Sequence, residues 1–149
     1  MKSDEIPAIV IDSREQLPYC FDGHPVEVRG LKTGDYSVLG CENLFAVERK
    51  SVDDLCQTLT HGRDRFEREL ARSNGLKRLY LIIESSLQAI ASGEYRSKAN
   101  PASIIGSLLA WEQRYPALRV MFCDNRQLAG RMVKSLLFRC FLEFSSERA

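Results

Sequence analysis

The amino-acid sequence predicts one α/β domain, residues 1–149, built on a mixed β-sheet. Short runs of strand character gather early in the chain and later alternate with segments of helical periodicity. Strands that come first and then alternate with helices are typical of a mixed sheet packed against helices. The length of 149 residues is normal for a single domain with its own hydrophobic core.

Six strands are expected from apolar or alternating runs bounded by turn-forming residues. They cover residues 7–11, 26–29, 35–39, 44–50, 79–83 and 118–122. The run at 79–83 is apolar throughout, which is typical of a central strand. The turn-like residues 40–43 lie between the third and fourth strands and predict a hairpin there.

Five helices are expected, at residues 51–59, 63–73, 87–91, 102–114 and 126–144. Ser51 can cap the first of them, with Asp54 at the third helical position. Residues 1–6 and 145–149 are expected to be tails.

The helix expected at the C-terminus is apolar on more than one face. One stripe and its flank comprise Leu128, Met132, Val133, Leu136, Leu137, Cys140, Phe141 and Phe144. A helix on the surface of a domain needs only one apolar stripe. We therefore expect the C-terminal helices to pair with another subunit, as a homodimer or a heterodimer. The alternative is a helix buried within its own domain.

Composition excludes several classes of protein. No apolar run approaches the roughly 18 residues that a membrane helix needs, and the polar residues 1–5 do not resemble a secretory signal. We therefore expect no membrane association and an intracellular protein, in the cytoplasm or nucleoid of a prokaryote or the nucleus of a eukaryote. The five cysteines are odd in number and widely spaced, which disfavours a disulfide framework or a zinc knuckle.

The strand expected at 44–50 ends with residues that can carry chemistry. Side chains alternate between the two faces of a strand, so Glu48 and Lys50 share one face and Arg49 lies on the other. The Glu48 carboxylate can bind a hard divalent cation through oxygen. The Lys50 ammonium can stabilise or orient a water that attacks a phosphate.

A second carboxylate is needed for a magnesium site, and Asp35 can supply it. Asp35 begins the first strand of the predicted hairpin, thirteen positions before Glu48 in the chain. Gly34 allows a sharp backbone turn before it. The hairpin would bring Asp35 beside Glu48, so that both could bind one metal ion, Mg²⁺ or in its place Mn²⁺.

Three segments together resemble a known family. They are residues 11–15 (Ile-Asp-Ser-Arg-Glu), residues 31–36 (Leu-Lys-Thr-Gly-Asp-Tyr) and residues 47–55 (Val-Glu-Arg-Lys-Ser-Val-Asp-Asp-Leu). This pattern resembles the nuclease domain of XPF-type structure-specific endonucleases, whose signature is GD followed at a variable gap by ERKxxxD. The resemblance extends over essentially the whole chain.

The resemblance implies a restriction-endonuclease-like fold, in which helices flank the mixed sheet. It implies metal-dependent hydrolysis of DNA phosphodiester bonds, at branched, flap or fork structures. Carried over, it makes Asp35 and Glu48 the metal ligands and Lys50 the catalytic lysine. It places Arg49, Asp54 and Asp12 in the active site.

Several of these positions also have structural interpretations. Asp54 lies where a capping box has its acidic residue, so it can serve the helix, the active site or both. Arg49 lies on the opposite face from Glu48, so either the strand bends at its end, or Arg49 supports the site from behind or contacts a phosphate. Asp12 and Arg14 can belong to an ordinary turn after the first strand.

Basic residues near these motifs are candidates for DNA contact. Arg14 follows the first strand, and Arg63 and Arg65 begin an arginine-rich helix after the Glu-Arg-Lys strand. Such side chains position the phosphate backbone without reading the base sequence. The alternative is that this helix presents a solvated charged face.

The sequence leaves the substrate and the catalytic competence of the domain open. Many relatives carry a helix-hairpin-helix module or a helicase region, and the 149 residues leave no room for either. We therefore expect a standalone nuclease domain. One alternative function is a non-catalytic nuclease-like domain that binds DNA or serves as a partner subunit. Another is a different phosphodiester enzyme on the same scaffold, such as a resolvase or an RNA-directed nuclease, because the motifs alone do not separate DNA from RNA.

Overall fold

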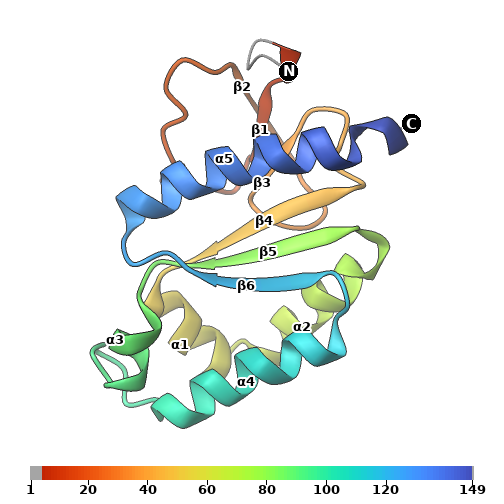
Figure 1. Ribbon diagram of the computed structural model, residues 1–149. Helices are drawn as coiled ribbons and strands as arrows, with labels where there is room; N and C mark the ends of the chain where they lie inside the picture. The colour runs from red at the N-terminus through yellow and green to blue at the C-terminus, as the bar shows by residue number, and fades with distance from the viewer. Residues whose placement is uncertain (1–4, 149) are drawn as a thin grey trace.

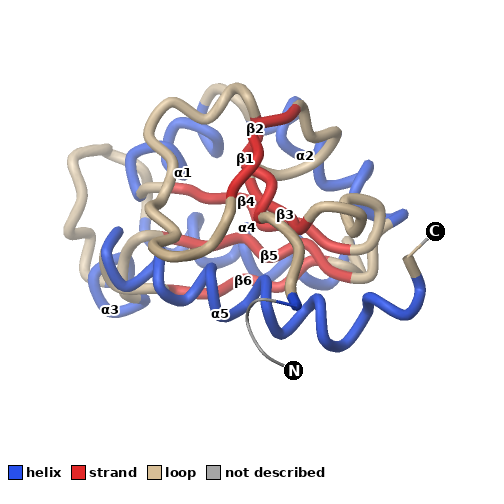
Figure 2. Tube along the Cα trace, turned by 90° about the horizontal axis from the view of Figure 1, so that it is seen from above, coloured by secondary structure: helices blue, strands red, loops and turns tan. Residues whose placement is uncertain are grey.

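A six-stranded mixed sheet forms the centre of the computed structural model, which describes residues 5–148. The strands are β1 (Ile9–Asp12), β2 (Val26–Arg29), β3 (Tyr36–Val38), β4 (Phe45–Lys50), β5 (Arg78–Ile83) and β6 (Leu118–Phe122). Their order is β2-β1-β3-β4-β5-β6, and Figure 2 shows it from β2 at one edge to β6 at the other. The pairs of β3 with β1 and with β4 are antiparallel, and the remaining pairs are parallel. This confirms the mixed sheet and the predicted hairpin between β3 and β4.

The five predicted helices are all present, with boundaries shifted by one residue at most. They are α1 (Val52–Thr60), α2 (Arg63–Arg72), α3 (Leu87–Ala91), α4 (Pro101–Arg114) and α5 (Arg126–Phe144). Ser51 caps α1, because its side chain accepts a hydrogen bond from the backbone N–H of Asp54. Asn125 caps α5 in the same way, through the N–H of Leu128.

The helices cover both faces of the sheet, in agreement with the predicted fold class. Figure 1 shows α5 on one side of the strands and α1 to α4 on the other. One hydrophobic core lies between α5 and the sheet and includes Phe45, Val47 and Val133. The other lies under α1, α2 and α4 and includes Ala46 and Trp111. The side chains of β4 thus alternate between the two cores.

Helix α5 is buried along one face within its own domain. Its buried residues are Ala129, Val133, Leu137, Cys140 and Phe141. The predicted stripe through Leu128 and Leu136 is only partly buried, and Met132 is 38% exposed. The buried face of α5 is therefore rotated around the helix axis relative to the predicted stripe. As a result, some apolar side chains of the stripe remain exposed to solvent.

The ends of the described chain are packed more closely than tails would be. Ile6 is buried in the core with an exposed fraction of 6%. Residues Ser145–Glu147 form a 3-10 helix, and Glu147 pairs with Lys77 at 3.0 Å. The predicted tails are therefore wrong at these positions, because the prediction used polarity alone and these residues gain tertiary partners. Residues 1–4 and 149 lie outside the described part.

All five cysteines carry free thiols, and four of them are buried. Within residues 5–148, no helix combines the length and the apolar character that crossing a membrane requires.

Candidate active site

The hairpin of β3 and β4 places Asp35 at the end of β4. The backbone N–H of Asp35 donates to the carbonyl oxygen of Val47 at 2.7 Å. The backbone N–H of Arg49 donates in return to Oδ2 of Asp35 at 2.8 Å. The Asp35 carboxylate is therefore held in place by the strand that carries Glu48.

Gly34 makes this close approach possible. Its φ angle is +82°, in the left-handed region that favours glycine. A Cβ atom at this position would lie 2.9 Å from Cβ of Ala46 and 3.0 Å from the carbonyl oxygen of Val47. Any larger residue would push the Asp35 backbone away from β4.

Glu48 and Lys50 lie on the face of β4 that is turned toward α1 and α2. Oε2 of Glu48 and Nζ of Lys50 are 3.8 Å apart, and Glu48 is 8% exposed. Nζ of Lys50 lies 4.7 Å from the centre of the Phe66 ring of α2. The carboxylate and the ammonium group thus lie side by side in a partly desolvated position.

Arg49 points to the other face of the sheet, as alternation predicts. Its guanidinium donates to the Glu84 carboxylate through Nε at 2.7 Å and through Nη2 at 3.1 Å. Its Nη1 lies 3.8 Å from Glu15, and the Tyr19 hydroxyl also donates to Glu84. The side chain of Arg49 therefore supports the site from behind the strand.

Asp12 lines the same cavity as Asp35 and Glu48, but its carboxylate already has two partners. Oδ1 accepts a hydrogen bond from the N–H of Leu31 at 2.8 Å, and Oδ2 accepts one from Nε of Arg14 at 2.9 Å. Arg14 also donates to the carbonyl oxygen of Leu31. Through these two hydrogen bonds, Asp12 holds in place the segment that leads to Gly34.

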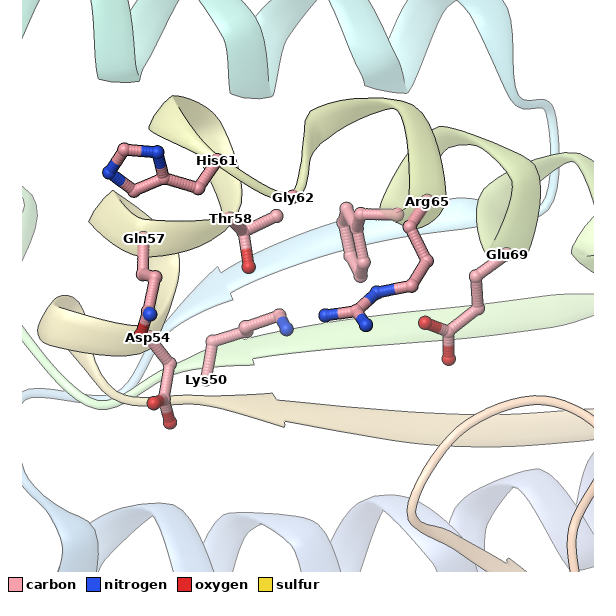
Figure 3. Close-up of a pocket in the computed structure, with 9 residues that line it drawn as sticks. Lys50, Asp54, Gln57, Thr58, His61, Gly62, Arg65 and Glu69 are labelled. Carbon is pink, nitrogen blue, oxygen red and sulfur yellow. The ribbon is translucent and has the colours of Figure 1, made fainter.

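Two neighbouring cavities, each of about 360 Å³, lie over the end of β4. The first contains both predicted metal ligands and is lined by Asp12, Arg14, Glu15, Lys32, Gly34, Asp35, Glu48, Arg65, Glu69 and Arg72. The second is lined by Lys50, Asp54, Gln57, Thr58, His61, Gly62, Arg65, Phe66 and Glu69 (Figure 3). Arg65 and Glu69 line both, so the two cavities form adjoining parts of one site.

The predicted DNA-binding residues take different positions. Arg65 lines both cavities, and Arg14 is largely exposed at the rim of the first. Arg63 instead packs against α4, where it donates to Oγ of Ser107 and lies 5.4 Å from the Trp111 ring centre. The structure therefore brings Arg14 and Arg65 to the site and holds Arg63 on the α4 side of α2.

Asp54 lies in the first turn of α1 and at the edge of the second cavity. Its backbone N–H is capped by Ser51 at 3.1 Å. Its side chain lines the second cavity together with Lys50. The geometry is therefore compatible with a structural role for the backbone and a site role for the carboxylate.

Sequence reasoning missed Glu69, Lys32 and Glu84. Glu69 lies three positions after Phe66 and next to Leu70 on α2, and both of these residues are buried. Residues three positions apart share one face of a helix, so the spacing from Phe66 to Glu69 could have predicted that Glu69 faces the sheet. Glu84 follows directly on β5, so its position at the end of a central strand was the available signal.

Burial and mutual repulsion change the acidity of the two predicted metal ligands. Burial raises the pKa of Asp35 to about 7, against the opposing effect of the hydrogen bond from the Arg49 amide. Burial also raises the pKa of Glu48 well above its ordinary value, and the nearby Asp35 and Glu69 carboxylates add to this effect. Without a cation, the site therefore disfavours full ionisation of its carboxyl groups.

The donor set suits a hard divalent cation. Carboxylate oxygens that repel each other in a desolvated place gain stability from a positive charge between them. Within residues 5–148, no three His, Cys, Asp or Glu side chains already form a closed metal cage. Asp35 and Glu48 therefore fit two ligands of an open site, in which water or substrate would complete the coordination of Mg²⁺.

Comparison with known proteins gives consistent results. The family model of the ERCC4 domain matches residues 11–136. The chain is 30% identical over 139 residues to the DNA repair endonuclease XPF of Cricetulus griseus, and 29% identical over 138 residues to that of Mus musculus. Each match covers 87% of this chain, which spans only 15% of the length of these relatives.

Among solved structures, XPF from Aeropyrum pernix has the same fold. The TM-score is 0.69 at 21% sequence identity, and the match covers 88% of this chain and 65% of that chain. The predicted restriction-endonuclease-like architecture is thereby confirmed. The domain model and the relatives match the segment that contains Asp35, Glu48 and Lys50. The chain belongs to the ERCC4 domain family and carries an XPF-type nuclease domain.

Proposed function

We propose that this protein is a divalent-metal-dependent endonuclease that hydrolyses DNA phosphodiester bonds, at branched, flap or fork structures. The observation that carries the proposal is the meeting of Asp35, Glu48 and Lys50 at one end of β4, over an open polar cavity. The matched relatives are DNA repair endonucleases by name, which supports the same reaction class.

Each residue has a role that its position supports. A bound Mg²⁺ would polarise the phosphate and lower the pKa of an attacking water. Asp35 and Glu48 would hold that cation, since both present oxygen ligands to the cavity. Lys50 would orient the water or stabilise the charge that develops on the phosphate oxygens. Its contact with Phe66 and Glu48 restricts the position of the ammonium group.

Basic side chains around the first cavity would position the DNA backbone. Arg14, Lys32, Arg65 and Arg72 all line it, and Arg14 is 74% exposed. Exposed arginines at a rim can contact phosphates on either side of the scissile bond. Because these contacts read the backbone, we expect discrimination between DNA shapes more than between base sequences.

A cleavage assay tests this function. Flap, fork, duplex and single-stranded DNA, with an RNA strand of the same sequence, are incubated with Mg²⁺, with Mn²⁺ or with chelator. We expect metal-dependent cutting that is fastest on the flap or fork. Glu48→Gln should reduce the rate by a factor of at least about 100, with a melting curve that shows an intact fold. Metal-independent cutting, or an unchanged rate in Glu48→Gln, would contradict the proposal.

The same assay addresses the alternative function. A domain that binds DNA with Asp35, Glu48 and Lys50 intact but never cuts it would act as a non-catalytic binding or partner subunit. We propose that the protein works where DNA is held, in the cytoplasm or nucleoid of a prokaryote or the nucleus of a eukaryote.

We also propose that the protein forms a dimer through its C-terminal helices. The support comes from apolar side chains left exposed on them, Leu109 of α4 at 58%, Met132 of α5 at 38% and Leu142 of α5 at 45%. These helices lie on opposite faces of the sheet, and β6 is an edge strand. A second copy of this chain is the partner we favour, because a two-fold interface can cover the same surface on both copies. A heterodimer partner is the other outcome of the test.

A further inference from the structure

A further hollow adjoins the active-site cavity on the side of the turn between β3 and β4. Its volume is about 420 Å³, and its walls are residues 32–33, the turn residues 42–43, and Arg72, Gly75 and Leu76. Lys32 and Arg72 also line the cavity of the two predicted metal ligands, so the two spaces share one wall. We call this space the side hollow. The reaction proposed for the active site leaves it unused.

The wall shared by the two spaces carries two uncommitted positive charges. Lys32 and Arg72 are both exposed, and among residues 5–148 neither side chain takes part in an ion pair. Lys77, by contrast, pairs with Glu147. An ammonium and a guanidinium group at the junction of two spaces attract a phosphate that passes from one to the other.

The far side of the side hollow suits a base better than a phosphate. Glu42 lies there and would repel a phosphate, whereas the half-buried Leu76 offers apolar surface to a flat ring. Thr33 and Asn43 carry donors and acceptors that can bond the edge of a base. At Gly75, an added Cβ atom would meet nothing within 4 Å, so the space is open there. The hollow therefore matches one nucleotide, with its phosphate at the shared wall and its base inside.

The state of the DNA decides whether a base can enter. A base within a duplex is stacked and paired, and it must leave the stack before it can fill a hollow. A base that is already single-stranded avoids most of this cost. The side hollow therefore selects an unpaired nucleotide.

We propose that the side hollow binds one unpaired nucleotide of the DNA strand, next to the bond that is cut. Lys32 and Arg72 hold its phosphate, and its base packs against Leu76. This inference rests on the proposed function, since it names a feature of the substrate that the same site recognises. It gives a physical reason for cutting flaps and forks, because single-stranded DNA must then lie beside the scissile bond.

An abasic scan tests the proposal without cleavage. Single nucleotides on either side of the junction of a fork are replaced, one at a time, by an abasic residue. Fluorescence anisotropy in chelator then measures the affinity of the wild type for each fork. We expect the affinity to fall by at least about fivefold at one unpaired position, the lower end for the loss of one bound base, and to change little at the others.

Filling the side hollow should abolish this dependence. Gly75→Phe places a ring in the open space, so the affinity for the intact fork should fall by at least about fivefold and the sensitive position should disappear. Gly75→Ala is the matched control, because a methyl group leaves most of the hollow open. It should keep the abasic profile of the wild type. Asn43→Trp fills the hollow from another wall and replaces Gly75→Phe if that variant melts early.

The phosphate contact has a separate readout. Arg72→Ala should weaken binding of the intact fork and reduce the slope of log affinity against log salt concentration by about 1. Arg131→Ala is its control, because Arg131 is an exposed residue of α5, on the other side of the sheet (Figure 1). That variant should leave the slope unchanged.

The possible failures can be told apart. A flat abasic profile in the wild type, or a profile that Gly75→Phe and Asn43→Trp leave unchanged, would overturn the role of the side hollow. The proposed nuclease function would still stand if the wild type cuts DNA with Mg²⁺ and Glu48→Gln does not. A wild type that neither binds nor cuts DNA would overturn both.

Discussion

The backbone amide of Arg49 donates a 2.8 Å hydrogen bond to the carboxylate of Asp35, while the Arg49 side chain projects from the opposite face of β4 to Glu84. One residue therefore connects the carboxylate in the cavity to the ion pairs under the sheet. Because the bond to Asp35 uses the main chain, it survives any side-chain substitution except proline. The side chain and the main chain of Arg49 can thus be tested separately.

The ion pair of Arg49 and Glu84 is expected to matter for stability more than for metal binding. Both side chains are largely shielded from solvent, with exposed fractions of 16% and 6%. Glu84→Ala leaves the Arg49 guanidinium without its main partner, so unfolding free energy should fall by about 3 kcal/mol. Urea denaturation measures this loss. Mn²⁺ affinity should change little, because the amide still holds Asp35.

Glu143→Ala provides the control for that substitution, since Glu143 is an exposed residue of α5. It should change stability by no more than about 0.5 kcal/mol. If Glu84→Ala were as mild as this control, the ion pair of Arg49 and Glu84 would not contribute measurably to the free energy of unfolding.

Gly34 is expected to tolerate no side chain. Gly34→Ala combines a φ angle of +82° with a Cβ atom only 2.9 Å from Ala46. The unfolding free energy should drop by at least about 2 kcal/mol, and cleavage should drop further because Asp35 shifts. Chemical denaturation and the cleavage assay measure the two effects.

Gly106→Ala in α4 is the matched control for this substitution. A Cβ atom there meets nothing within 4 Å, and the position is helical. Alanine should therefore stabilise the protein by about 0.5 to 1 kcal/mol. A Gly34→Ala protein as stable and active as the wild type would show that the hairpin can shift without harm.

The metal-free protein is expected to lose stability as pH rises from about 4 to about 7. Asp35 has a folded-state pKa of about 7, above its ordinary value, so the folded protein binds this proton more tightly than the unfolded chain. Its contribution is therefore fully present at low pH and lost as pH rises through the folded pKa. Melting temperatures in chelator, recorded across this range, check the slope.

The variant Asp35→Asn isolates the source of that slope, because it removes the titrating group. Its melting temperature should depend less on pH than that of the wild type. Added Mn²⁺ should stabilise the wild type most at pH 8, where the carboxylates are charged. Equal slopes in the two proteins would assign the pH dependence to other groups.

The proposed dimer is expected to depend on the exposed apolar residues of α5. Light scattering at micromolar concentration should give a mass twice the 17.0 kDa of one chain. Met132→Glu places a charge in that surface and should shift the mass to that of the monomer. Gln127→Glu adds the same charge at an exposed position of α5 and should leave the dimer intact. A wild-type mass of 17.0 kDa would contradict self-association.

The secondary structure and the main site motif could be predicted from the sequence because both depend on local patterns. Alternation along β4 was enough to place Glu48 and Lys50 on one face and Arg49 on the other. The turn residues 40–43 were enough to predict the hairpin that brings Asp35 to Glu48. Each of the segments 11–15, 31–36 and 47–55 is a weak signal alone, and the resemblance to the XPF-type family combined them into one predicted active site.

The remaining features depend on packing that no local pattern contains. Arg63 and Arg65 are two positions apart in one basic helix, yet Trp111 attracts one while the other faces the cavities. Glu84 follows an apolar strand, and only the tertiary fold reveals Arg49 as its partner. Ile6 lies in a polar segment, yet it packs into the hydrophobic core between α5 and the sheet.

The alternation of β4 between two cores has a consequence for mutational tolerance. Position 46 packs under α1, α2 and α4, positions 48 and 50 lie on that same face, and positions 45, 47 and 49 serve the α5 side. If every substitution were made along this strand, activity and abundance would be lost in different places. Abundance would fall mainly at 45, 46, 47 and 49, while full-length, folded but inactive protein would accumulate at 48 and 50. The last four codons of the strand would then record, with a period of two, which side performs chemistry and which side holds the molecule together.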